Sequence, residues 1–188
     1  MTPAAAPVTL AVAIAVAEED GAPVQSDAWI DAQLAQANVL FEAAGVRFRW
    51  TARRPLPAPL TRAGSREDRD AFGGTMEPRA VNVSVIASLA DVDEAGRFRM
   101  GVCWQNRKDH DKRYILLSSI ARPSVLAHEL GHFFGNPHSS VTDNVMSYDR
   151  TGGPVFFDTA QLARIHARAF AALAAGSLLE APPAKWWP

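Results

Sequence analysis

The sequence contains a single cysteine, Cys103, and only five histidines among its 188 residues. With one cysteine no intramolecular disulfide can form, so a small disulfide-stabilised fold is excluded. Charge is nearly balanced as well, with 19 basic and 20 acidic residues. The sequence has no excess of basic residues that would predict nucleic-acid binding, and no acidic tail that would predict disorder. The protein must therefore select its partner through a specific site rather than through its overall charge.

Long apolar runs and internal repeats are also missing. No stretch approaches the roughly 18 apolar residues of a membrane-spanning helix, so we expect no membrane span. The lack of a repeat excludes solenoids and repeat arrays. The chain is 48% apolar, which is enough to bury one core, and it is too short for a second large domain. We expect a single domain over residues 1–188, and a monomer.

Three of the five histidines fall in one short stretch, HELGHFFGNPH. His128 and His132 are four residues apart, so on a helix they project from one face, close enough to share a metal ion. Glu129 then lies next to that ion rather than on it. Gly135 tolerates a positive φ, which ends the helix and turns the chain back toward the helix face. His138 is thereby returned to the metal.

Three neutral imidazoles leave a tetrahedral zinc ion with one open position, which distinguishes catalytic from structural zinc sites. Zinc lowers the pKa of a bound water from about 15.7 toward roughly 7. Glu129 is placed to accept the proton as that water attacks a carbonyl, and to deliver it to a leaving amine. The spacing predicts one catalytic Zn²⁺, with His128, His132 and His138 as ligands and Glu129 as general base and acid.

A plain structural interpretation competes with this one, because an amphipathic helix with histidines on its wet side needs no metal. The helical wheel places Leu126, Leu130 and Phe133 on one side, nearly opposite His128 and His132. The imidazoles therefore face a cleft or solvent rather than the core. The glycine and third histidine at the extended spacing strengthen the metal-site interpretation further.

The extended motif HExxHxxGxxH resembles that of the metzincin clan of zinc endopeptidases, in which a methionine turn follows. The sequence Asn144-Val-Met-Ser-Tyr148 comes shortly after the motif. By resemblance, Met146 is the methionine of this turn and forms an apolar floor beneath the histidines. Tyr148 is similar to a tyrosine that several metzincins place near the metal, where it ligates zinc or hydrogen-bonds the developing oxyanion. The alternative for Tyr148 is an ordinary half-buried tyrosine.

The order of predicted elements extends the resemblance along most of the chain. Alternating apolar residues predict strands at 8–16, 46–50, 81–86 and 114–118, with an edge strand at 100–104. Helices are predicted from Ser26 or Asp27 to Gly45, from Ser65 to Phe72, from Pro123 and Ser124 through the motif, and after a capping box formed by Asp158 and Gln161. This pattern indicates an α/β or α+β domain with a twisted mixed sheet of about five strands, a backing helix and an active-site helix.

The resemblance implies a zincin-like fold in two parts, an upper subdomain over 1–135 and a lower subdomain over 136–188 with the Met-turn and one long helix. In metzincins an extended peptide pairs with the sheet edge in the cleft between these parts. Residues 101–105 would supply the edge. Residues 149–155 would shape the pocket for the substrate side chain that follows the cleaved bond.

Two segments are expected to be the least regular. One is 53–79, which is rich in Pro, Arg and Gly, and the other is the C-terminal tail. We expect Trp186 and Trp187 in that tail to pack back onto the body. The run from Val8 to Ala17 has the length of a signal-peptide core, but no Lys or Arg precedes it, and its large–small alternation favours a strand. We expect a soluble protein, secreted if a leader was removed and otherwise cytoplasmic.

Cys103 falls in a predicted strand, where a small buried residue is expected. In some metzincins a propeptide cysteine blocks the zinc, but nothing before the first predicted strand resembles such a propeptide. A separate protein inhibitor, export before folding or narrow specificity would then restrain activity in the producing cell.

The sequence therefore predicts a zinc metalloendopeptidase that acts on extended peptides or proteins. One alternative is a zinc-stabilised binding module without catalysis, in which Cys103 closes the site as a fourth ligand. Such a module needs neither Glu129 nor Tyr148, which favours the enzyme. A second alternative applies the same machinery to one dedicated protein, as a toxin-like protease would, or to a non-peptide amide.

Overall fold

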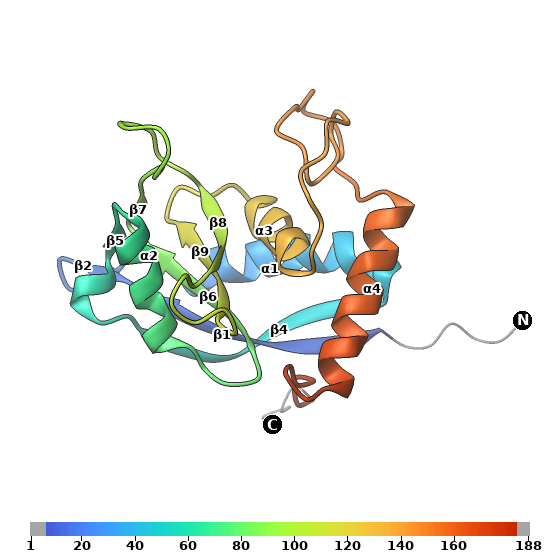
Figure 1. Ribbon diagram of the computed structural model, residues 1–188, viewed down its shortest axis with the longest axis horizontal. Helices are drawn as coiled ribbons and strands as arrows, with labels where there is room; N and C mark the ends of the chain where they lie inside the picture. Colours follow the sequence, from blue (N-terminus) through green and yellow to red (C-terminus); the bar gives the residue numbers. More distant parts are fainter. Residues whose placement is uncertain (1–6, 184–188) are drawn as a thin grey trace, which may run out of the picture.

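Five strands form the central sheet of the protein, which the computed structural model describes over residues 7–183. Across the sheet their order is β4 (Val46–Pro55), β1 (Val8–Val16), β6 (Val81–Ile86), β9 (Arg113–Ser118) and β8 (Gly101–Gln105). The first four run parallel, and β8 pairs with β9 in the antiparallel sense at the edge. The predicted mixed sheet, including its edge strand, is confirmed (Figure 1).

The side chains of β1 alternate between two buried faces of the sheet. Leu10, Val12 and Ile14 belong to the main core, whereas Ala15, and Ala17 just after the strand, belong to a smaller core on the opposite face. Because both faces are covered, the strand is buried from Leu10 onward. The predicted strand at 8–16 is confirmed. Its side chains alternate between two faces that are both shielded from water, as in a parallel sheet covered on both sides.

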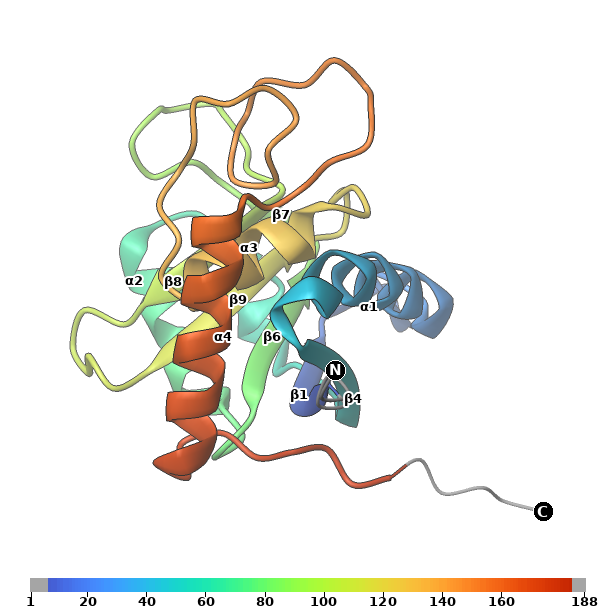
Figure 2. The same cartoon turned by 90° about the vertical axis from the view of Figure 1, so that its right-hand side faces the viewer.

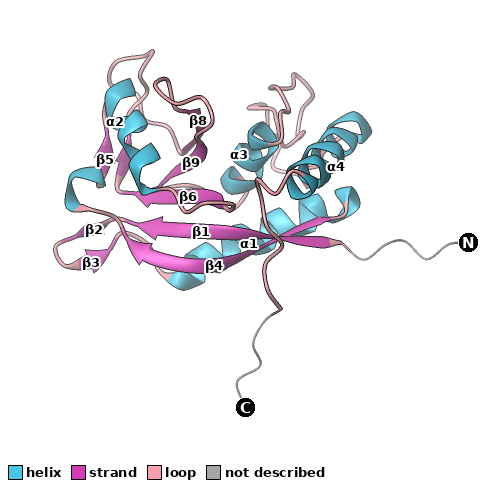
Figure 3. Ribbon diagram, turned by 60° about the horizontal axis from the view of Figure 1, so that its bottom comes forward, coloured by secondary structure: helices cyan, strands magenta, loops and turns pink. Residues whose placement is uncertain are grey.

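Helices α1 (Asp27–Phe41), α3 (Val125–Phe133) and α4 (Thr159–Ala174) cover the face of the main core. Helix α1 begins at the predicted cap, where the Ser26 hydroxyl accepts a hydrogen bond from the Trp29 amide at 3.2 Å. After a 3₁₀ turn, η1 (Glu42–Ala44), the chain leaves through Gly45 at a φ of +69°. Figure 3 shows α1 behind strands β1 and β4, with α3 and α4 close together.

The opposite face carries short elements where an irregular segment was predicted. Helix α2 (Arg66–Ala71) has the predicted Ser65 cap. Around it lie η2 (Ala58–Leu60), β5 (Arg62–Ala63), η3 (Phe72–Thr75) and β7 (Ser88–Leu89), which pairs with β5. The prediction that 53–79 is among the least regular segments is therefore wrong, because Leu56, Ala63 and Phe72 are buried in the smaller core and anchor it.

Strand β4 also continues beyond its predicted end at Trp50. The register with β1 shifts by one residue between Val12 and Ala13, and Pro55 then pairs with Val16. Proline is tolerated there because β4 is an edge strand, where a missing N–H removes no ladder hydrogen bond. A small hairpin of β2 (Glu18–Glu19) and β3 (Ala22–Pro23) follows β1.

Helix α4 begins at the predicted capping box. The Asp158 carboxylate accepts from the Gln161 amide at 2.8 Å, and the Gln161 side chain accepts from the Asp158 amide at 2.9 Å. Figure 2 shows α4 along one side of the molecule, with the 136–157 segment above its first turn. None of the helices in residues 7–183 is long and apolar enough to cross a membrane. Trp186 and Trp187 lie outside the described residues.

Candidate metal centre

Helix α3 carries the first two histidines, and a side chain from α1 fixes its start. Ser124 occupies the cap position but makes no side-chain cap hydrogen bond. Instead, the buried Gln33 accepts from the Leu126 amide at 3.3 Å. Its amide nitrogen donates to the carbonyl oxygens of Ala121 and Arg122, both at 3.1 Å. One glutamine therefore satisfies an end group of α3 and ties this helix to α1.

The end of α3 returns the chain toward the helix face as predicted. The helix stops at Phe133, and Gly135 has a φ of +85°. The Asn136 amide then donates back to the Gly131 carbonyl at 2.9 Å. This closed turn brings His138 to the same side as the histidines of α3.

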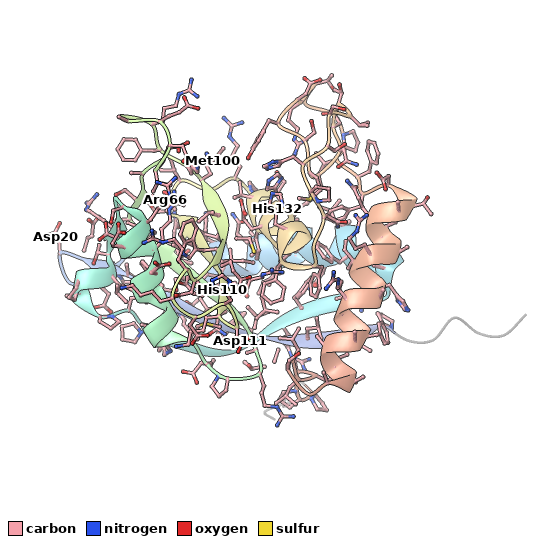
Figure 4. All side chains as sticks on the ribbon, in the orientation of Figure 1. Asp20, Arg66, Met100, His110, Asp111 and His132 are labelled. Carbon is pink, nitrogen blue, oxygen red and sulfur yellow. The ribbon has the colours of Figure 1, made fainter. Side chains whose placement is uncertain are left out.

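The structure brings the three predicted imidazoles together. Nε2 of His132 lies 3.1 Å from Nε2 of His128 and 3.0 Å from Nε2 of His138. Within residues 7–183, this is the one group of three His, Cys, Asp or Glu side chains whose ligand atoms all lie within 4.8 Å of one another. Figure 4 labels His132 on α3, between the loops that rise on either side.

Backbone carbonyls hold the other ring nitrogen of two of these histidines. Nδ1 of His128 lies 2.7 Å from the Val145 oxygen, and Nδ1 of His132 lies 2.8 Å from the Asn136 oxygen. Because a carbonyl only accepts, each Nδ1 carries the proton and each Nε2 presents its lone pair. Burial lowers the pKa of His128 to about 4 and also lowers the pKa of His132, which in both cases favours the neutral ring.

This donor set fits a divalent metal ion. Unprotonated Nε2 atoms only 3.0 and 3.1 Å apart direct lone pairs at one another, which is unfavourable without a cation between them. Tetrahedral zinc, with zinc–nitrogen bonds of about 2.0–2.1 Å, sets neighbouring nitrogens about 3.3 Å apart. The observed spacing is close to this value, so the group can hold a metal ion.

Glu129 lies beside the imidazoles and is only 5% exposed. Strand β8 passes directly over it, since a Cβ added to Gly101 would lie 3.0 Å from the carboxylate Oε1. Burial raises the pKa of Glu129 to about 7, while a hydrogen bond from the Cys103 amide and the charge of Arg99 oppose that shift. A cation among the imidazoles would favour the ionised carboxylate further.

The predicted Met-turn packs against α3. Met146 is fully buried, and a Cβ added to Gly131 would collide with its Sδ. The turn is joined to the centre through its backbone, because Val145 holds His128 and the Met146 carbonyl accepts from the Ser139 amide at 2.9 Å. Met146 therefore supports the helix from which two of the imidazoles project.

Tyr148 reaches the same centre from the segment after the turn. Its hydroxyl lies 2.9 Å from Nε2 of His138. The residue is 71% exposed, which is more than expected of an ordinary half-buried tyrosine. The structure therefore places the phenol beside the imidazole group, as the sequence predicted.

These groups open into a cleft of about 830 Å³. Its lining includes Arg99 and Gly101 on one side, Tyr148 and Val155 on the other, and His128 and Glu129 between them. Figure 1 shows the 90–100 loop and the 136–157 segment rising on either side of α3. A second cavity of about 980 Å³ lies between the β8–β9 connection and α4, and none of the three clustered histidines lines it.

Strand β8 presents its outer backbone edge to this side of the molecule. On that edge the Cys103 amide donates to Glu129. The Met100 carbonyl accepts from Ser118 and the Asn106 amide donates to Lys112, so even-numbered residues of this stretch face β9. Odd-numbered residues then point their backbone groups outward. They are Gly101, Cys103 and Gln105.

Cys103 is not part of the three-imidazole group. Burial raises the pKa of its thiol to about 12. The metal-ligating form of cysteine is the thiolate, so a thiol kept neutral in this way is a poor fourth ligand. It lies in β8 as predicted, but it is partly rather than fully buried there.

Solved structures that include a metalloproteinase and an archaemetzincin resemble this fold. Metalloproteinase-II from Bacteroides fragilis has a TM-score of 0.60 at 14% identity, over 89% of this chain and 55% of that chain. Archaemetzincin from Methanopyrus kandleri has a TM-score of 0.58 at 15% identity, over 90% of this chain and 99% of that chain. Mature mirolysin from Tannerella forsythia, in complex with a cleaved peptide, has a TM-score of 0.61 at 13% identity, over 94% and 100%.

The chain has the metzincin fold. At 13% to 15% identity the likeness shows this fold and not an activity. The chain spans only 55% of the length of the Bacteroides protein, although it spans nearly all of the other two. No protein-family profile matches the sequence, and no curated protein matches it.

Sequence reasoning missed two features of the centre. One is Gln33, whose partners lie about ninety residues away, so no local signal marks it. The other is the pairing of Arg99 with Asp91 beside the cleft. The sequence from Asp91 to Gly96 is a turn signal that locates the loop, but it does not reveal the ion pair.

Proposed function

We propose that the protein is a zinc-dependent metalloendopeptidase. The observation that carries the proposal is the convergence of three Nε2 atoms, two of them on rings fixed by backbone carbonyls, beside a buried glutamate. Structural zinc takes four protein ligands and has no use for an adjacent carboxylate. Three imidazoles and a neighbouring carboxylate therefore support a catalytic centre.

In this proposal His128, His132 and His138 hold the zinc ion, and Met146 supports them from below. The bound ion would supply Lewis acidity, which polarises the scissile carbonyl and makes a water molecule easier to deprotonate. Glu129 accepts the proton of the attacking water on its carboxylate and passes it to the leaving amine. The Tyr148 hydroxyl donates a hydrogen bond to the carbonyl oxygen as negative charge develops there.

We also propose that the substrate is an extended peptide that pairs with the outer edge of β8. Outward-facing backbone groups offer hydrogen bonds to any sequence, while pockets beside the strand select side chains. The mirolysin structure that shares this fold contains a cleaved peptide, which supports a peptide substrate. Residues 149–155 are proposed to shape the pocket after the cut.

Residues 1–188 are proposed to act as one catalytic domain and as a monomer, with 1–135 above the cleft and 136–188 below it. A continuous core supports this arrangement, because Val145 and Ile165 of the second part pack in the same cluster as Phe41 and Leu130 of the first. A separate protein inhibitor is proposed to restrain the enzyme.

The decisive experiment combines metal analysis with a cleavage assay. The purified protein is analysed for bound transition metals and incubated with a diverse peptide library, with and without a chelator. Mass spectrometry then identifies the cut bonds. We expect about one zinc per chain, cuts within peptides, and loss of all cutting with the chelator. Cutting that survives complete metal removal would overturn the proposal.

Histidine variants give a matched control for this experiment. His132→Ala should lose zinc and activity together, because it removes the central imidazole of the group. His110→Ala should keep both, since His110 is exposed and lines the other cavity. Zinc retained at the wild-type level by His132→Ala would contradict the ligand assignment.

A further inference from the structure

Arg99 lines the cleft and is held from below by a buried carboxylate. Its Nη2 lies 2.9 Å from Oδ2 of Asp91, whose side chain is only 7% exposed, while that of Arg99 is 36% exposed. Asp91 also accepts hydrogen bonds from the backbone amides of Asp93 at 2.9 Å and Glu94 at 3.3 Å. The guanidinium therefore has little freedom to leave the cleft.

The loop that carries Arg99 is closed at its base. The Arg99 amide donates to the Leu89 carbonyl at 2.8 Å, and the Asp91 amide donates to the Arg97 carbonyl at 2.9 Å. These bonds fix the backbone of Arg99 relative to the sheet, next to the start of β8. Figure 4 labels Met100, the following residue, at this rim.

Positive charge exceeds negative charge beneath this loop. Arg69 is buried there, and its Nη2 donates to the Ala90 carbonyl at 2.7 Å. Asp91 pairs with Arg99 and Asp93 pairs with Arg66, so two acids face the three guanidinium groups of Arg66, Arg69 and Arg99. Among the described residues, Nε of Arg69 and Nε of Arg99 are both buried without a hydrogen-bond partner. The pair of arginines is therefore short of acceptors.

The remaining charges of the cleft do not correct this imbalance. Arg122 and Arg150 also line it, and neither makes an ion pair with an acid within residues 7–183. Arg97 is paired with Glu94 at 2.7 Å, and both are exposed. The other acid of the lining is Glu129, which the proposed function assigns to proton transfer. The cleft therefore favours an incoming anion.

Arg99 lies beside the imidazole centre. It lines the same cleft as His138, Tyr148 and Glu129. It also comes two residues before Gly101, where an added Cβ would lie 3.0 Å from Oε1 of Glu129. A cation at this position lies close enough to contact a substrate residue bound near the reacting bond.

We propose that Arg99 is a specificity-determining residue that binds a carboxylate of the substrate near the bond that is cut. The proposal rests on the proposed endopeptidase function and names its substrate class, peptides with Glu or Asp close to the cut. A guanidinium matches a carboxylate through two parallel hydrogen bonds, which Lys and neutral side chains do not reproduce. The carboxylate comes from an acidic side chain or from a free C-terminus, and the test separates the two.

The test uses peptides that differ in one group. The starting point is a peptide that the wild-type zinc-loaded protein cuts. Each residue flanking the cleaved bond is replaced in turn by Glu or by Gln. Each of these peptides is made with a free C-terminal carboxylate and with a C-terminal amide. We expect kcat/KM to be about 10- to 100-fold higher with the added carboxylate in at least one position. Arg99→Gln should bring that ratio close to one.

Arg97→Gln is the matched control. Arg97 lies on the same loop and lines the same cleft, but it is paired at the surface, so the variant should keep the wild-type ratio. Arg99→Lys keeps the charge without the planar fork and should give an intermediate ratio. If Arg99 only braces the loop, Arg99→Gln slows the Glu and Gln peptides equally, and that outcome overturns the proposal.

A binding measurement separates this proposal from the proposed function. In a Glu129→Ala background, fluorescence anisotropy gives the Kd of labelled Glu and Gln peptides without turnover. We expect about a tenfold difference that shrinks with added salt and with Arg99→Gln. A wild-type protein that cuts no peptide overturns the endopeptidase, and the binding measurement then decides on Arg99. Equal Kd and equal cutting of Glu and Gln peptides overturn the role of Arg99 alone.

Discussion

The side-chain amides of Asn144 and Gln161 pair with each other in a buried joint between the Met-turn and helix α4. Nδ2 of Asn144 donates to Oε1 of Gln161 at 2.8 Å, and Nε2 of Gln161 donates to Oδ1 of Asn144 at 3.0 Å. The same Asn144 oxygen accepts from the Met146 amide at 2.9 Å. The start of α4 is thereby connected to the methionine beneath the imidazoles.

Asn144→Ala should lower the free energy of unfolding by about 1–3 kcal/mol, because it leaves the buried Gln161 amide without its partner. Urea denaturation of the metal-free protein measures this loss. In Asn144→Ala combined with Gln161→Ala, the total loss should be smaller than the sum of the single losses, since neither side-chain amide is then left buried without the other. Strictly additive losses would contradict the pairing.

Glu129→Ala should retain zinc but lower kcat by about 10²- to 10⁴-fold, because it removes the proton acceptor and leaves the imidazoles intact. Metal analysis and a peptide-cleavage assay measure the two effects separately. Glu94→Ala is the control, since Glu94 lines the same cleft in an exposed ion pair. A Glu129→Ala protein that cuts peptides as fast as the wild type would show that the role is wrongly assigned.

Tyr148→Phe should be milder, lowering kcat by no more than about 100-fold while KM and zinc content stay close to the wild-type values. The variant keeps the ring and loses only the hydroxyl near His138. It should therefore weaken only the stabilisation of the negative charge that develops during the reaction. Steady-state kinetics with one peptide substrate measures it. Unchanged kcat would make Tyr148 an ordinary surface tyrosine.

Gly131→Ala should destabilise the protein by about 1–2 kcal/mol, since overpacking against the buried Met146 outweighs the better helix propensity of alanine. The new Cβ would also lie 3.2 Å from the Phe157 ring. Gly74→Ala is the matched control, because nothing lies within 4 Å of a Cβ there. Thermal denaturation of the two variants compares them, and equal stability would contradict the close packing.

Cys103 should react slowly with iodoacetamide in the native state at pH 9, because burial raises the pKa of its thiol from 9.0 to about 12. The unfolded thiol ionises first. The stability that the neutral thiol contributes is therefore complete below about pH 9 and is lost as the pH rises toward 12. Mass spectrometry follows alkylation with and without urea. Equal rates in both conditions would show an exposed thiol.

Local signals predicted much of the fold and the metal centre. The Ser26 cap, the Asp158 capping box and Gly135 each act within four residues, so their effects are readable along the chain. The spacing of the motif histidines likewise predicted that their side chains converge, because helix geometry and one turn determine where these side chains lie.

Features that join distant segments could not be predicted in this way. The cap that Gln33 supplies depends on how α1 docks against α3. The regular structure of the segment around Leu56 and Phe72 depends on a second core. A composition rich in Pro, Arg and Gly predicted an irregular segment there and gave no sign of this core. The Arg99–Asp91 pair depends on the path of a loop. Tertiary packing decided each of these outcomes.

The glutamine cap has a consequence for biosynthesis. A nine-residue helix is too short to persist alone in water, so α3 is completed only when α1 has docked and Gln33 has reached it. The carbonyl of Val145, which orients His128, is translated later still. The hydrogen bonds that start α3 and orient His128 are therefore complete only after Val145 has been made, so on the proposed function a chain that is still shorter than this lacks a finished metal centre.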